Sequence, residues 1–280
     1  MSKKLKKRLI IAAVLLVMAA LSAWGFAMET VRYKVSSDKL DSVIKIVFIS
    51  DLHNCFYGDT KQSKLIQEVK SSSPDIVIFG GDVIDAWGGT KYALLLIKEL
   101  SKDYPCFYTP GNHEQERDDK EEFYAKVQKL CPMLLGEYEQ ISINGQDIRI
   151  YGTLDNYSFG KKKTQLEECF DTLDDKYYNI LIAHQPEQID SYIGKGKGYD
   201  TKFDLILSGH AHGGQWRIPK LLDQGLYAPD QGIFPDYTTG MYEYDGTTHI
   251  ISRGLARPMR MIFIPRIFNR PELSVITIGQ

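Results

Sequence analysis

The chain of 280 residues opens on a long apolar run and then alternates short apolar runs with amphipathic stretches. The opening run, residues 9–28, reads LIIAAVLLVMAALSAWGFAM and contains no charged side chain. Twenty residues at about 1.5 Å per residue span about 30 Å, the thickness of the hydrocarbon core of a bilayer. The pattern therefore predicts one N-terminal transmembrane helix ahead of a globular body.

Charge on the two sides of this run predicts its orientation. Five basic residues precede it, and no acidic residue occurs before Glu29: Lys3, Lys4, Lys6, Lys7 and Arg8. The positive-inside rule makes residues 1–8 a basic cytoplasmic tail and residues 9–28 a signal anchor, with the body outside the membrane. A cleaved signal peptide and a secreted body are the alternative, because small residues near Ala19 and Ala23 would permit cleavage. Residues 29–41 are interpreted as a linker, and residues 42–280 as one domain.

The body shows strand-like runs separated by helical stretches. Strands are expected at 43–50, 75–80 and 106–109, and helices at 60–72, 92–100 and 120–130. Two shorter strands, 141–143 and 148–152, flank Asn144-Gly145, which is a strong hairpin signal. Buried strands follow at 179–184 and 204–210, and the chain closes on the strand-like runs HIIS and LSVITI. This alternation predicts an α/β protein with mixed sheets.

The charge of the body limits its partners. Without the five N-terminal cations, 29 basic residues stand against 36 acidic ones, which leaves a net charge of −7. Electrostatically driven nucleic-acid binding needs a cationic face, so no nucleic-acid partner is expected. The four cysteines, Cys55, Cys106, Cys131 and Cys169, match no zinc-binding spacing. Cys106 lies within an apolar run and is interpreted as a core residue.

Five polar clusters each follow directly after an apolar strand, where the ligand sites of open α/β sheets lie. They are Asp51-Leu52-His53, Gly81-Asp82-Val83-Ile84-Asp85, Gly111-Asn112-His113-Glu114, Ala183-His184 and Gly209-His210-Ala211-His212-Gly213-Gly214. A single His or Asp at a strand end is usually a hydrogen-bonded or capping residue. Here five of the six histidines fall in the clusters, and only His249 is interpreted as structural. Imidazole and carboxylate together suit Zn, Fe, Mn or Co.

The order D-x-H, G-D-x-x-D, G-N-H-E, H and G-H-x-H resembles the calcineurin-like metallophosphoesterase superfamily, over about residues 44–278. Gly213-Gly214-Gln215 and Arg270-Pro271-Glu272 resemble the membrane-associated bacterial phosphodiesterase subgroup, which is similar to UDP-2,3-diacylglucosamine pyrophosphatase-like enzymes. The resemblance implies a four-layer αββα sandwich with mixed sheets, a phosphoric ester hydrolase activity and two divalent metal ions. Among Mn, Fe, Zn and Co, Mn is favoured.

The resemblance also implies a role for each matching residue. Asp51, His53 and His212 would bind the first metal, and Asn112, His184 and His210 the second. Asp82 would bridge the two. A hydroxide shared by the metals would attack phosphorus at the outer side of the membrane. His113 would face the phosphate as a catalytic residue, with Asn112 contributing as a ligand. Asp85 is interpreted as a residue behind the ligands that orients His113, or as a plain turn residue, and Glu114 similarly.

The substrate is less determined than the chemistry. A phosphodiester or a pyrophosphate, including lipid-linked forms, is the first expectation, and a phosphomonoester is the alternative. A non-catalytic scaffold and a nuclease on the same fold are the remaining options. The segment 253–270 either contacts anionic lipid, or its apolar residues are core and its arginines pair with the acidic body: Arg253, Arg257, Arg260, Arg266 and Arg270. The glycine-rich loop at 194–199 either shapes the pocket or is an ordinary surface loop.

Overall fold

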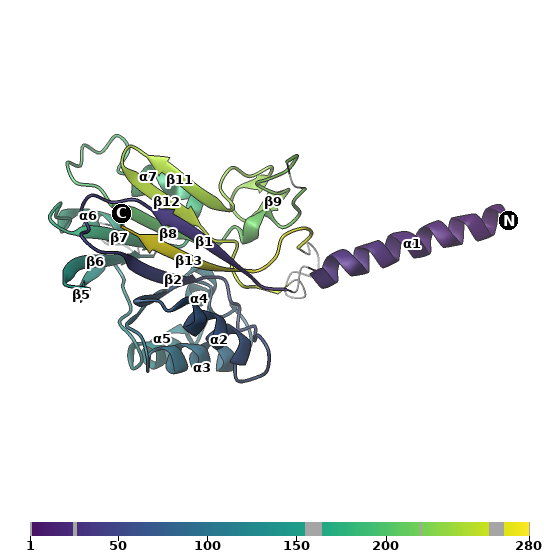
Figure 1. The fold of residues 1–280 in the computed structure, drawn as a ribbon, viewed down its shortest axis with the longest axis horizontal. Coiled ribbons are helices and arrows are strands. Elements are labelled where there is room, and N and C mark those ends of the chain that lie inside the picture. Colours follow the sequence, from purple (N-terminus) through teal and green to yellow (C-terminus); the bar gives the residue numbers. More distant parts are fainter. Residues whose placement is uncertain (1, 25–26, 155–163, 219, 258–265, 280) are drawn as a thin grey trace.

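A computed structural model describes residues 2–24, 27–154, 164–218, 220–257 and 266–279. Helix α1 (Lys3–Trp24) projects from the body as a single long helix (Figure 1). Within the described ranges, no helix meets the combined length and apolarity needed to cross a membrane.

Two mixed sheets form the centre of the body. The first has the order β1 (Glu29–Val35), β13 (Glu272–Ile278), β2 (Ile44–Ile49), β3 (Ile76–Gly80) and β4 (Cys106–Thr109). The second has the order β11 (Gly240–Tyr244), β12 (Thr247–Ile251), β8 (Leu205–Ser208), β7 (Tyr178–Ala183), β6 (Gln146–Thr153) and β5 (Glu137–Ile143). In each sheet the neighbouring central strands run parallel: β2, β3 and β4 in the first, and β12, β8, β7 and β6 in the second. The carboxyl ends of several strands therefore lie at one edge of each sheet.

Short helices cover the outer faces of the sheets. Helices α2 (Ser63–Ser72), α3 (Lys91–Leu100) and α5 (Lys120–Gln128) contribute buried residues to the core that covers one face of the first sheet. Helices α6 (Gln165–Asp171) and α7 (Ile189–Tyr192) do the same for the second sheet. Two brief elements, α4 (Asn112–Gln115) and the 3₁₀ turn η2 (His212–Gly214), lie inside two of the predicted polar clusters. A small hairpin pairs β9 (Tyr227–Ala228) with β10 (Gly232–Ile233).

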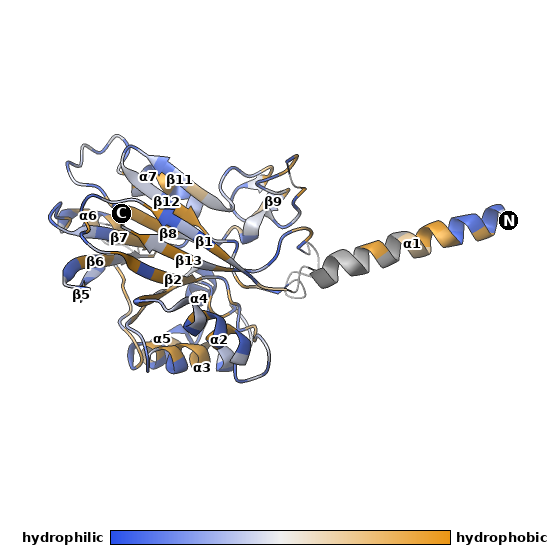
Figure 2. Ribbon diagram, in the orientation of Figure 1, coloured by the Kyte–Doolittle hydropathy of each residue, from blue (hydrophilic) through white to orange (hydrophobic). Residues whose placement is uncertain are grey.

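Strand alternation separates three apolar cores. In β2, Ile46 and Phe48 face the second sheet, where they share a core with Ile180 and Ile182 of β7. The intervening residues of β2 face the helices. Both faces of these strands are buried, which is why they read as continuous apolar runs; the strands are correspondingly apolar in Figure 2. Each such side chain contributes about 1.5–3 kcal/mol on full burial. The order helix, sheet, sheet, helix matches the expected layering.

Most predicted elements are present within a few residues of their expected bounds. The helices expected at 60–72, 92–100 and 120–130 are α2, α3 and α5. The hairpin at Asn144-Gly145 is confirmed, since β5 and β6 pair antiparallel with Ile143 opposite Gln146. Both turn residues have positive φ, 52° and 79°, as a type I′ turn requires. Cys106 is buried as predicted, and all four cysteines are free thiols.

The predicted linker over residues 29–41 is wrong for its first seven residues. They form β1, which pairs in parallel with β13 from Glu29 opposite Glu272 to Val35 opposite Ile278. Strand β1 is an edge strand, so most of its side chains stay partly exposed and no apolar run marks it. Pattern reading therefore missed a strand that belongs to the sheet.

Three arginines of segment 253–270 form ion pairs or hydrogen bonds with other residues of the body. Arg253 pairs with Glu272 at 2.7 Å and with Glu29 at 3.0 Å. Arg266 is 2% exposed and donates to the carbonyl oxygen of Arg253. Arg270 donates to two carbonyl oxygens just before β1, those of residues 27 and 28. Arg260 and the apolar residues around it, 258–265, lie outside the described residues.

Candidate metal centre

The five polar clusters come together where the carboxyl ends of strands from both sheets meet. Asp51 and His53 follow β2, Asp82 follows β3, and Asn112 and His113 follow β4. His184 follows β7 of the second sheet, and His210 and His212 follow β8. The Nε2 atom of His184 lies 3.2 Å from Asp82 Oδ2 and 3.8 Å from Asp51 Oδ1. Residues from the two sheets therefore share one site.

The backbone of these loops is held in an unusual conformation. Five of the predicted ligands have positive φ, between 47° and 64°: Asp51, His53, Asp82, His210 and His212. Such residues cost on the order of 1–3 kcal/mol each and persist where the surroundings fix them. Here the loops fix one another, because Asp51 N–H donates to the Gly81 carbonyl and His53 N–H to the Asp82 carbonyl. Strain of this kind is typical of functional sites.

Two glycines allow the loops to approach this closely. A Cβ atom on Gly81 would lie 2.5 Å from Nδ1 of His184, and one on Gly254 would lie 2.4 Å from Cβ of Asp51. Both glycines also have positive φ, 87° and 69°. A larger residue at either position would push a predicted ligand out of place.

In the described part of the chain, four groups of side chains have ligand atoms within 4.8 Å of one another, and three of these groups consist only of predicted site residues. One contains Asp51, His53 and His212, and a second contains Asp82, His184 and His210. The first group consists of the residues predicted for the first metal, and the second contains the predicted bridge Asp82 with two of the three residues predicted for the second metal. The third contains His53, Asp82 and His113. Asp82 is therefore the residue that lies between both sets.

The donors and the unsatisfied atoms of the site fit divalent cations. Asp51 Oδ2 and Asn112 Oδ1 are buried and accept no hydrogen bond within the described part of the chain. An unsatisfied buried acceptor costs about 1–3 kcal/mol, which a cation would offset. His184 Nδ1 lies 2.8 Å from the Gly80 carbonyl oxygen, to which it donates. This hydrogen bond directs Nε2 toward Asp82 and leaves its lone pair for a metal.

Charge and burial in the site keep Asp82 ionised and His212 neutral. Burial raises the pKa of Asp82, but His184, His113 and His53 outweigh burial and lower it well below its usual value. Burial, together with His53 and Arg266, holds the pKa of His212 well below its usual value. Carboxylate and neutral imidazole are the forms that bind metal.

Asp85 connects a predicted ligand to the predicted catalytic histidine. Its Oδ1 atom lies 3.0 Å from Nδ1 of His113 and 3.4 Å from Nδ1 of His53. Burial lowers the pKa of His113, but the hydrogen bond to Asp85 and the charge of Asp82 raise it to about 9. The protonated ring donates through Nδ1 to Asp85 and leaves Nε2–H, 3.8 Å from Asp82 Oδ2, as a proton donor.

Glu114 supports the loops from behind and does not face the metal groups. Its carboxylate accepts hydrogen bonds from the backbone N–H groups of Asp82, Ile84 and Gly111 and from the hydroxyl of Tyr108. The side chain is fully buried. It therefore fixes the loop that presents Asp82 and the start of α4, which presents Asn112 and His113.

Sequence reasoning missed two residues that contact the site. Asp230 Oδ2 lies 2.8 Å from Nε2 of His210, and an Arg266 guanidinium nitrogen lies 3.4 Å from Nδ1 of His212. Asp230 is 20 residues from His210 in the chain, in a Pro-Asp-Gln-Gly segment that reads only as a turn. Arg266 belongs to the basic segment 253–270, but no pattern in the sequence links it to a histidine of the site. His249 is structural, as expected: burial lowers its pKa to about 3, and it bonds Ser208.

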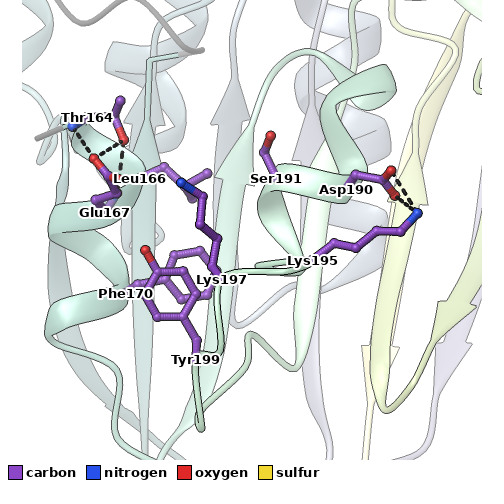
Figure 3. A pocket seen from close by; sticks show the side chains of 9 residues that line it. All are labelled: Thr164, Leu166, Glu167, Phe170, Asp190, Ser191, Lys195, Lys197 and Tyr199. Atoms are coloured by element: carbon purple, nitrogen blue, oxygen red, sulfur yellow. Dashed lines mark hydrogen bonds and ion pairs between the residues drawn. The ribbon is translucent and has the colours of Figure 1, made fainter.

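A pocket of about 260 Å³ lies apart from these residues, beside α6 and α7. The loop at 194–199 borders it, and Tyr199 stacks on Phe170 with ring centroids 4.0 Å apart (Figure 3). Lys195 pairs with Asp190 at 2.9 Å on the opposite side. The pocket is lined by none of the predicted ligands, so the loop borders a pocket that is separate from the metal groups.

Comparison with known proteins agrees with the geometry. Residues 44–214 match the family described as calcineurin-like phosphoesterase. The chain belongs to this family. An uncharacterized metallophosphoesterase of Helicobacter pylori (strain J99) is 30% identical over 220 residues, which cover 76% of this chain and 54% of that protein. The phosphodiesterase YaeI of Escherichia coli is 23% identical, with 89% and 87% covered.

Among solved structures, the Haemophilus influenzae NAD nucleotidase shares the fold. The likeness has a TM-score of 0.50 and 16% identity, and covers 76% of this chain and 45% of that one. The chain thus spans about half the length of the Helicobacter relative. The family membership and the Asp and His groups together indicate a dinuclear divalent metal site.

Proposed function

We propose that the protein hydrolyses a phosphodiester or a pyrophosphate with two divalent metal ions held at the meeting edge of its sheets. The position of Asp82 carries the proposal. One buried carboxylate lies within reach of His53 at 3.9 Å and of His184 at 3.2 Å, and these histidines belong to the two different groups. A shared carboxylate is what a two-metal site requires to hold its ions about 3.5–4 Å apart.

The remaining ligands follow from the two groups. Asp51, His53 and His212 would hold one ion with Asp82, and Asn112, His184 and His210 would hold the other. All these donors are nitrogen or oxygen, without a thiolate, so the site would take Mn²⁺, Fe, Zn²⁺ or Co²⁺. We favour Mn²⁺. When bound, the ions would supply Lewis acidity and lower the pKa of water toward neutrality.

The protein's own groups complete the chemistry. His113 would place Nε2–H toward the substrate phosphate, stabilise charge on its oxygens and protonate the leaving oxygen. Asp85 would hold His113 through Nδ1 and keep that proton in place. Glu114 would keep the loops rigid, because its four hydrogen bonds join the loop after β3 to α4.

Apolar residues beside the site support a lipid-linked substrate. Residues 216–218 and 220–234, here the apolar lobe, follow η2 directly, and Leu226 N–H donates to the Gly214 carbonyl at 2.9 Å. The lobe exposes Leu221 by 79%, and Ile233 and Phe234 by 68% each. A lobe that exposes several large apolar side chains beside a site is a candidate surface for an apolar part of the substrate. An acyl or prenyl chain attached to the phosphate would cover them.

A hydrolysis panel tests this proposal. Full-length protein in detergent would be assayed with Mn²⁺ on bis(4-nitrophenyl) phosphate, 4-nitrophenyl phosphate, a nucleoside diphosphate, and lipid-linked pyrophosphates with a long and a short chain. Diester or pyrophosphate turnover is expected to exceed monoester turnover and to stop on chelation. The longer chain is expected to lower KM about tenfold if it buries two more methylene groups than the shorter one. Each buried methylene group contributes about 0.8 kcal/mol.

The outcomes separate the levels of the proposal. Faster monoester turnover would reassign the protein as a phosphomonoesterase. Equal KM values for the long-chain and short-chain substrates would contradict a lipid-linked substrate. An absence of turnover on every substrate would favour a scaffold, and cleavage of plain DNA a nuclease.

We also propose that the body lies outside the cytoplasm, tethered by residues 9–28. The support is the uncharged run, which follows five basic residues and ends at residue 28, directly before β1. Protease added to intact cells after outer-layer removal is expected to digest the body and to spare a membrane-bound N-terminal fragment. Full protection of the body would contradict the orientation, and release of the intact body into the medium would favour a cleaved signal peptide.

A further inference from the structure

One carboxylate of the apolar lobe, that of Asp230, contacts the predicted metal centre. Asp230 lies in the turn between β9 and β10 and has a φ of 57°. Its neighbour Ala228 is fully buried, and Phe234 N–H donates to the Leu226 carbonyl at 2.9 Å. The turn is therefore anchored on both sides. Residues 44–214, which define the family match, do not include it.

The carboxylate of Asp230 links one residue of the second ligand set, His210, to the chain neighbour of another, His184. Its Oδ2 atom lies 2.8 Å from Nε2 of His210 and accepts a hydrogen bond from Nε2 of Gln185 at 3.3 Å. Gln185 directly follows His184 and also accepts a short hydrogen bond from Gln188. One oxygen thus connects His210 to the residue next to His184.

We propose that Asp230 is a positioning residue that holds the His210 ring so that Nδ1 faces the second metal ion. The inference rests on the proposed function, because it takes His210 as a ligand. An imidazole has two nitrogens, and the one engaged by Asp230 is Nε2. The carboxylate accepts a hydrogen bond from Nε2–H, which fixes the tautomer with a free lone pair on Nδ1.

The surroundings explain why this ring needs an outer partner. His210 is 3% exposed, whereas the Asp230 side chain is 59% exposed. The proposed inner partner of the His210 ring is the cation. The outer edge of the ring contacts the solvent-facing lobe through Asp230. The ring planes of His184 and His210 stand at 70°, with centroids 5.3 Å apart. Rotation of His210 by a few tens of degrees would therefore spoil a geometry that the two histidines share.

A rival arrangement uses the same atoms. Glu187, His210 and Asp230 also have ligand atoms within 4.8 Å of one another, which would suit a third ion at the outer edge. We favour the positioning role because 2.8 Å is an ordinary distance for a charge-assisted hydrogen bond and the same Oδ2 atom also accepts a hydrogen bond from Gln185. The number of ions bound at saturation distinguishes the two arrangements.

The test is Mn²⁺ binding to full-length protein in detergent, after removal of metal by chelation and dialysis. Wild type is expected to bind two ions by equilibrium dialysis and to give the EPR signal of a coupled Mn²⁺ pair. Asp230→Asn is expected to bind one ion as wild type does and the second 10–100-fold more weakly, the loss typical of an outer-shell partner. Its EPR spectrum should then be that of a single Mn²⁺ at concentrations that saturate the wild type.

Asp236→Asn is the matched control, since Asp236 carries the same charge, is exposed, and lies just beyond the lobe. It is expected to bind both ions as wild type does, and the unfolding midpoint of the metal-free protein should be the same in all three proteins. If Asp230→Asn bound both Mn²⁺ ions with the affinities of wild type, the inference would be overturned. An equal loss in Asp236→Asn, a lowered midpoint with both ions weakened, or three ions in the wild type would also overturn it. Fewer than two ions in the wild type would overturn the proposed function itself.

Discussion

Asp82→Asn is expected to bind at most one metal ion and to retain less than one hundredth of wild-type turnover. The substitution keeps the shape of the side chain but removes the charge shared by both ligand groups. Loss of an outer-shell partner already costs 10–100-fold in metal affinity or activity, and a shared direct ligand should cost more. The measurement is metal content by mass spectrometry alongside steady-state kinetics on bis(4-nitrophenyl) phosphate.

Metal-induced stabilisation gives an independent readout for the same variant. A ligand at 100 times its Kd stabilises the native state by about 2.7 kcal/mol, so wild type should unfold at a higher temperature when Mn²⁺ is added. Asp82→Asn should lose most of this increase while its metal-free midpoint stays close to that of wild type. Asp236→Asn should keep the increase. A wild-type response in Asp82→Asn would show that Asp82 does not join the two ions.

His113→Ala is expected to keep both metal ions and to lose about 10²–10⁴-fold in kcat, the usual contribution of a positioned general acid. The ring contacts Asp85 and Asp82, so its removal takes away the proton donor and none of the proposed ligands. Metal content and kcat measured on the same preparation separate the two effects.

The leaving group serves as an internal control for His113→Ala. A nitrophenolate leaves without help from an acid, whereas an alkoxide needs a proton. The loss of kcat should therefore be smaller on a nitrophenyl ester than on an alkyl ester of the same phosphate. An equal loss on both would mean that His113 stabilises the phosphoryl oxygens and donates no proton. Full activity on both would remove His113 from the mechanism.

The parts of the fold with strong local signals could be predicted from the sequence. Strands buried on both faces, such as Ile76–Gly80, read as apolar runs because every side chain packs against a core. The polar clusters could be placed at one edge because each follows such a strand. The rule that parallel strands end at a common edge places Asp82 and His184 each at the edge of its own sheet, but their meeting depends on how the two sheets pack.

The remainder depends on contacts between distant parts of the chain. Edge strand β1 has no apolar run, so its pairing with β13 had no local signal. Asp230 reads as a turn residue, and only the folding of the lobe brings it to His210. The positive φ values of Asp51 and Asp82 are imposed by the loops that cross them, since neither sequence context demands them. Long-range geometry of this kind is not contained in residue patterns.

The position of β13 has a consequence for how the chain reaches its native state. This strand, residues 272–278, lies between β1 and β2, the first two strands of the body (Figure 1). During synthesis, β1 and β2 therefore leave the ribosome long before the strand that joins them exists. The first sheet can close only after residue 278 has emerged, and until then two strand edges stay open to wrong pairing. We therefore expect folding to be late and dependent on the C-terminal residues, although the metal ligands are complete by His212.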